Sequence, residues 1–164
     1  MGETYECFTQ DGTKCFFEQT SHHPPRSHFL LEAKDGLYKL NGYLEIEIYA
    51  GMKTTEVNCL GFKQLDLADG GKIRWNFNND SLSGMFVGTP LHQMKGRVTF
   101  TDEANGLVGY YDYGAYTFKK QDFSWGEIHQ NGKKVCEVTG NYMGFLDFDN
   151  VRYWDVREAD NIFL

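Results

Sequence analysis

The sequence YKLNGYLEIEIY, residues 38–49, alternates between apolar and polar side chains through its second half. Successive side chains of an extended strand point to opposite faces, so this stretch divides into an apolar face and a polar face. The apolar face takes Leu44, Ile46 and Ile48, and the polar face takes Glu45, Glu47 and Tyr49. The pattern predicts a strand that packs its apolar face against a core or a ligand.

The same two-residue period recurs on both sides of this stretch. Ile73, Trp75 and Phe77 share one face of residues 72–77, and Val98 and Phe100 share one face of residues 95–101. We predict strands at 4–9, 14–19, 27–33, 38–49, 54–63, 72–77, 82–87, 95–101, 107–119, 123–129, 133–141, 145–149 and 152–157. No long segment has the 3.6-residue period of a helix, and the tail from residue 158 is expected to be helical or frayed.

Turn signals separate these strands at short intervals. The chain has 18 glycines and only 3 prolines, and Asp11-Gly12, Asn105-Gly106 and Asn131-Gly132 are typical hairpin turns. Asn78-Asn79-Asp80 is expected to break the chain between two strands. Sequential strands with short turns predict an all-β antiparallel meander that closes into a barrel, with a β-sandwich as the alternative.

Composition narrows the class of protein. A chain of 164 residues forms one domain, residues 1–164, and its 16 basic and 23 acidic residues give a net charge of −7, which disfavours nucleic-acid binding. The four cysteines (Cys7, Cys15, Cys59 and Cys136) lack Cys-x-x-Cys spacing and predict reduced thiols in a cytosolic protein. No signal peptide or membrane-spanning run is present, and we expect neither a cofactor nor a metal.

The octet EQTSHHPP, residues 18–25, carries the clearest functional signal. Its two prolines fix the backbone and predict an extended piece that enters a rigid turn. Neighbouring residues of a strand point to opposite faces unless a bulge or bend redirects one of them. If the rings of His22 and His23 converge, they form a pair of donors suited to a phosphate. Since imidazole titrates near neutrality, we expect such binding to weaken above about pH 7.

This octet resembles the signature EQVSHHPP of the oxysterol-binding protein family, with Thr20 in place of valine. Residues 2–6, GETYE, and residues 139–142, TGNY, resemble flanking segments of the same family. The resemblance implies a large, partly closed antiparallel barrel around a hydrophobic tunnel. It also implies that His22 and His23 contact the phosphate of a lipid headgroup. Ser21 is a weaker candidate as a further donor.

The resemblance further implies lipid binding and non-vesicular lipid transfer. A sterol, or another neutral lipid, would be exchanged for phosphatidylinositol 4-phosphate by a cytoplasmic protein that contacts organelle membranes peripherally. The apolar faces of residues 44–48 and 73–77 would line the tunnel or form plain core. Family members carry a lid before the GETYE segment and a basic portion after the last segment matched here. We therefore expect a partial barrel whose open edges favour self-association.

Two other functions compete with lipid transfer. An enzyme would use Cys15 on a neighbouring strand with the histidine pair, or a metal held by His22, His23 and His28, but no catalytic motif supports either, and we predict no enzyme. A sensor or scaffold would bind phosphoinositides without moving them. The doublets Lys119-Lys120 and Lys133-Lys134 would touch an anionic membrane if they share a rim, and are otherwise solvated turn lysines.

Overall fold

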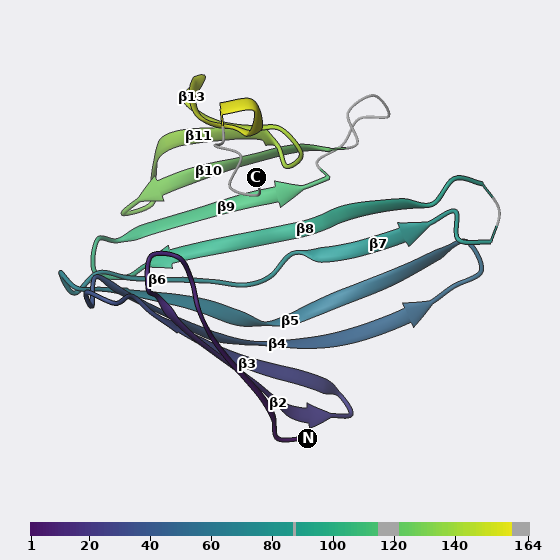
Figure 1. The fold of residues 1–164 in the computed structure, drawn as a ribbon. Coiled ribbons are helices and arrows are strands. Elements are labelled where there is room, and N and C mark those ends of the chain that lie inside the picture. The colour runs from purple at the N-terminus through teal and green to yellow at the C-terminus, as the bar shows by residue number, and fades with distance from the viewer. Residues whose placement is uncertain (87, 115–121, 159–164) are drawn as a thin grey trace.

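The computed structural model describes residues 1–86, 88–114 and 122–158, and all strands in these ranges join one antiparallel sheet (Figure 1). Their order in the sheet is β1-β2-β3-β4-β5-β6-β8-β9-β10-β11-β12-β13, with β7 between β5 and β8. The strands are β1 (Glu3–Phe8), β2 (Lys14–His22), β3 (Pro25–Glu32), β4 (Tyr38–Ala50), β5 (Thr54–Leu67), β6 (Lys72–Trp75), β7 (Asn79–Ser83), β8 (Leu91–Asp102), β9 (Leu107–Tyr113), β10 (Phe123–Gln130), β11 (Lys133–Asn141), β12 (Phe145–Phe148) and β13 (Val151–Asp155). The predicted all-β meander is confirmed.

Strand register places apolar side chains in continuous rows on one face. Cys15 pairs with Leu31, Leu31 with Leu40, Leu40 with Leu65, and Leu65 with Ile73. Directly paired residues of antiparallel strands share a face and lie about 4.5–5.5 Å apart, so this row forms a continuous apolar strip across five strands. The alternation seen in the sequence therefore aligns from strand to strand.

The opposite face is polar and carries ion pairs between strands. Arg97 donates from Nε and Nη2 to the two carboxylate oxygens of Asp112, at 2.8 and 2.7 Å. Further along the sheet, Arg152 of β13 pairs with Asp147 of β12. Such pairs hold exposed strands in register without an apolar layer above them.

The apolar face is only partly covered. Within the described ranges, the hydrophobic residues that are buried are Cys15, Val98 and Val138. Strands β1 and β13 stand at the two ends of the strand order and, as far as the chain is described, do not pair with each other. The sheet is strongly curved (Figure 1), and it forms a partial barrel as predicted, not the two packed sheets of a sandwich.

Several predicted element boundaries were wrong. Asn79 and Asp80, expected to break the chain, begin β7: Asn79 pairs with Lys95 of β8, and Asp80 pairs with both β5 and β8. Strand β7 ends at Ser83, short of the predicted 82–87, of which residue 87 lies outside the described ranges. The predicted strand 107–119 is β9 up to Tyr113, and residues 115–119 are not among those described. The last predicted strand ends at Asp155, where a 3₁₀ turn (Val156–Glu158) begins.

The meander places its turns alternately at two ends of the sheet. The β2–β3, β4–β5 and β7–β8 turns point toward the same end of the sheet, which we call the histidine end because residues 22–25 form the first of them (Figure 1). The β1–β2, β3–β4 and β10–β11 turns lie at the opposite end. In the part of the chain that is described, no helix has the length and apolar character needed to span a bilayer.

Candidate functional site

Strand β2 ends at His22, and β3 begins three residues later at Pro25. The β2–β3 register shifts between Gln19 and Ser21, which leaves Thr20 as a β-bulge. Beyond the bulge, Ser21 pairs with Arg26 and His22 pairs with Pro25. The turn that follows brings the rings of His22 and His23 together, with centroids 4.4 Å apart and planes inclined by 50°. The condition set by the sequence, that both rings converge, is met.

Both histidine side chains are exposed, and the residues beneath them are held by other partners. The Thr20 hydroxyl lies 2.9 Å from Nδ1 of His28, and the His28 ring lies 5.4 Å from the ring of Tyr43. Ser21 is half-buried, and its carbonyl accepts a hydrogen bond from the Gln19 side chain at 3.3 Å. The bulge is therefore fixed from below while the two imidazoles remain available to a ligand.

The cation nearest in register to this turn is already paired. Arg26, opposite Ser21, donates from Nε to Oε2 of Glu45 at 2.7 Å, and its guanidinium lies 5.5 Å from the Tyr43 ring centroid. A phosphate at the turn would therefore meet imidazole donors first. Protonated imidazoles would supply both N–H donors and positive charge.

A cavity of about 570 Å³ lies on the apolar face toward the C-terminal half of the sheet. Its walls are mainly aliphatic and aromatic, and they include Ile73, Phe100, Ile128, Val138, Phe145 and Trp154. This volume lies within the range of small-molecule sites. Its few polar groups belong mostly to tyrosines, as at Tyr111 and Tyr113, and burial raises the pKa of both phenols, which keeps them neutral.

The sequence identified the cavity walls only in part. Of the residues expected to line a tunnel, Ile73 lines this cavity, and the others do not: Leu44, Ile46, Ile48, Trp75 and Phe77. Ile48 is in fact largely exposed near the end of β4. The run of tyrosines in residues 107–119 was a signal for Tyr111 and Tyr113, but alternation alone did not show that they would line a cavity.

The catalytic alternative does not fit the geometry. Cys15 lies on the same strand as His22, not on a neighbouring one, and the two stand near opposite ends of the nine-residue β2. At about 3.3 Å per residue they are roughly 20 Å apart. Burial also raises the pKa of the Cys15 thiol, which disfavours the thiolate a nucleophile requires.

The described residues support neither a metal site nor a basic rim. Among them there is no cluster of three or more His, Cys, Asp or Glu side chains able to hold an ion. Lys134 pairs with Glu127 at 2.8 Å and with Glu137 at 2.9 Å, at the end opposite the histidines. The partner doublet, Lys119-Lys120, falls outside the described ranges.

The sequence of this chain matches a family model and a known protein. The family model described as oxysterol-binding protein matches residues 1–161. Oxysterol-binding protein 9 of Dictyostelium discoideum is 32% identical over 185 residues, which cover 96% of this chain and 43% of that protein.

Two solved structures have a similar fold. The Osh1 ORD domain in complex with cholesterol gives a TM-score of 0.78 at 20% identity, over 88% of this chain and 35% of that one. The Osh3 ORD in complex with PI(4)P from Saccharomyces cerevisiae gives 0.79 at 19% identity, over 95% and 44%. The chain thus spans less than half the length of each of these three proteins.

Proposed function

Because this chain belongs to the oxysterol-binding protein family, we propose that it binds lipids and transfers them between membranes. The observation that carries the proposal is the convergence of His22 and His23, with ring centroids 4.4 Å apart, on a sheet whose apolar face holds a large cavity. The two features suit the two parts of an amphiphile. The phosphorylated headgroup would lie at the histidine turn, and apolar parts of the lipid would lie against the apolar face.

The histidine turn suits a phosphate because it offers adjacent donors on a fixed backbone. Charge-assisted N–H bonds to phosphate oxygens are short and strong. Ser21 is the further donor of this proposed site, through its hydroxyl. Since only protonated imidazoles carry charge, binding is expected to weaken as the pH rises from 6 to 8.

The apolar face suits the rest of a lipid. Each buried CH₂ group contributes about 0.8 kcal/mol, so a sixteen-carbon acyl chain represents roughly 13 kcal/mol of apolar exposure. The proposed exchange partners are a sterol, or another neutral lipid, and phosphatidylinositol 4-phosphate. The ligands named for the Osh1 and Osh3 structures, cholesterol and PI(4)P, support these two classes. The proposed location is cytoplasmic, at the surface of organelle membranes.

A sensor that binds phosphoinositides without moving them is the second candidate. It is favoured by the open sheet, because a lipid carrier has to shield its cargo from water and few apolar residues are fully covered in the described ranges. Transfer of a fluorescent sterol between vesicles separates the two functions. A sensor would bind the vesicles but leave the sterol where it was.

The decisive experiment compares binding to phosphatidylcholine vesicles with and without phosphatidylinositol 4-phosphate. We expect the phosphoinositide to increase binding by the wild type, and the double variant His22→Ala/His23→Ala to lose that increase. His129→Ala, which removes a histidine at the opposite end of the sheet, is the matched control. An increase retained by the double variant, or equal wild-type binding at pH 6 and pH 8, would contradict the proposed headgroup site.

A further inference from the structure

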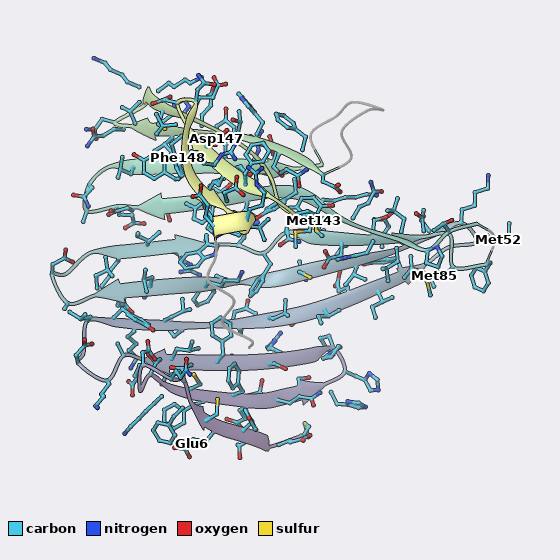
Figure 2. All side chains as sticks on the ribbon, turned by 45° about the horizontal axis from the view of Figure 1, so that its top comes forward. Glu6, Met52, Met85, Met143, Asp147 and Phe148 are labelled. Carbon is cyan, nitrogen blue, oxygen red and sulfur yellow. The ribbon has the colours of Figure 1, made fainter. Side chains whose placement is uncertain are left out.

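Two hairpin turns at the histidine end lie side by side. The β4–β5 turn contains Met52, and the β7–β8 connection contains Met85 and Phe86. Strands β5 and β7 pair up to Thr54 and Ser83, so their two connections leave the sheet from adjacent positions. Figure 2 shows Met52 and Met85 together at one extremity of the molecule, beyond the body of the sheet.

Large apolar side chains cover these two turns and are exposed. Met52 is 91% exposed, Phe86 82% and Met85 61%. The adjoining strand ends add further exposed apolar residues, and we call the whole set the apolar tip: Ile48, Tyr49, Met52, Met85, Phe86 and Leu91. An exposed apolar cluster of this size indicates an interaction surface.

Charge at the apolar tip differs from the charge of the whole protein. The chain carries 23 acidic residues, yet residues 50–55 and 83–91 contain none, and their single charged side chain is Lys53. Two carboxylates on the adjoining strands have partners: Glu56 pairs with Lys95, and Glu47 accepts a hydrogen bond from Tyr49 of the apolar tip itself. An amphipathic lysine beside apolar residues suits a bilayer surface, where its stem is buried and its ammonium group stays at the headgroups.

The shape of the apolar tip favours a bilayer over a second protein. A stable protein interface buries about 800 Å² on each partner over a complementary surface. Two protruding turns present a narrow convex edge instead of such a surface (Figure 2). A protruding apolar edge enters the boundary between headgroups and acyl chains without requiring a matching pocket.

We propose that the apolar tip inserts into the surface of a lipid bilayer and holds the histidine end against the membrane. The β2–β3 turn, with His22 and His23, lies at this same end of the sheet (Figure 1). Arg26, at the start of β3, pairs with Glu45, and β4 runs on to Ala50 before the turn with Met52, so the histidine turn is set back from the apolar tip and insertion would turn it toward the membrane. The inference rests on the proposed function for its purpose, but the contact itself depends on apolar burial and not on the phosphate.

The experiment measures binding to vesicles of pure phosphatidylcholine, which lack the phosphoinositide. The test variant is Met52→Ser/Phe86→Ser. The control variant is Phe8→Ser/Leu37→Ser, which removes two exposed apolar side chains from the opposite end. Withdrawing a large apolar side chain from a membrane weakens binding about tenfold or more, so we expect at least that loss in the test variant and none in the control.

Separate measurements distinguish this contact from the headgroup site and from self-association. Binding of a soluble, short-chain phosphatidylinositol 4-phosphate should be the same for wild type and test variant. If neither protein bound this lipid, the result would count against the headgroup site and not against the insertion. Equal binding of wild type and test variant to neutral vesicles, or no binding by the wild type, would overturn the proposed insertion. Sedimentation velocity without vesicles would overturn it too, if the substitutions converted a dimer into a monomer.

Discussion

At the scale of single residues, Glu127 on β10 is a carboxylate with three partners on the polar face. Its oxygens lie 2.8 Å from Nζ of Lys134, 2.7 Å from the Tyr110 hydroxyl and 2.9 Å from Nε2 of His129. These bonds, led by the one from Lys134, lower the pKa of Glu127 from its ordinary 4.5 to about 2. The ionised form is therefore favoured in the folded protein.

This shift predicts a specific loss of stability in acid. A carboxylate whose pKa is lower in the folded state stabilises the fold above its ordinary pKa, and the effect disappears as the pH falls from about 4.5 to about 2. We expect the free energy of unfolding to fall more steeply over this range for wild type than for Glu127→Gln. Urea titrations at several pH values would measure it. Parallel curves for the two proteins would show that Glu127 contributes no such linkage.

The bulge at Thr20 is the part of the histidine turn that the sequence alone could not predict. The sequence pointed to His22 and His23 as candidates for phosphate contact, because the double proline and the paired histidines are local signals, and that contact stays a prediction. It left open whether the rings converge, since two neighbours on a regular strand point apart. The bulge at Thr20 and its bond to His28 come from pairing with β3, eight residues away, and no local pattern encodes that contact.

At the scale of elements, β7 shows how pairing overrides local preference. Asn78, Asn79 and Asp80 favour a turn, yet Asn79 pairs with β8, and Asp80 pairs with both β5 and β8. The side-chain oxygen of Asn79 accepts a hydrogen bond from the backbone N–H of Cys59 at 3.0 Å. Regular alternation in the sequence identified β4, β6 and β8. The polar start of β7 has no such alternation, and only its pairing with neighbouring strands in the structure shows that it is a strand.

The bond from Cys59 to Asn79 predicts the cost of removing this side chain. Asn79→Ala would leave a partly buried N–H without its acceptor, and we expect destabilisation by about 1–2 kcal/mol. Asn79→Asp keeps an acceptor oxygen in the same place and is expected to cost less. Chemical denaturation of the three proteins measures the difference. Equal stability of the alanine variant and wild type would mean that solvent satisfies the Cys59 N–H.

At the scale of the whole molecule, the sheet is a single curved layer with an apolar face, and its two edge strands, β1 and β13, each pair with one neighbour among the described strands. Family resemblance predicted the partial barrel, but strand alternation could not say how far the curvature proceeds, because curvature depends on twist and bulges summed over all strands. Self-association through the edges β1 and β13 stays a prediction. Sedimentation over a range of protein concentrations tests it, and a monomer at every concentration would contradict it.

The cavity on the apolar face predicts that a bound lipid stabilises the whole sheet. A ligand at about 100 times its dissociation constant adds about 2.7 kcal/mol, which raises Tm by roughly 5–11 °C in a domain of this size. Gly109 lines the cavity, and a Cβ there would meet only ordinary contacts, the nearest at 3.5 Å from Ile128. Gly109→Leu should therefore fold but occupy the space a ligand needs.

The control variant, Gly144→Leu, adds the same side chain at a site with no atom within 4 Å. Thermal unfolding with short-chain phosphatidylinositol 4-phosphate should show the full rise in wild type and Gly144→Leu and a reduced rise in Gly109→Leu. The same rise in all three would place the lipid outside this cavity.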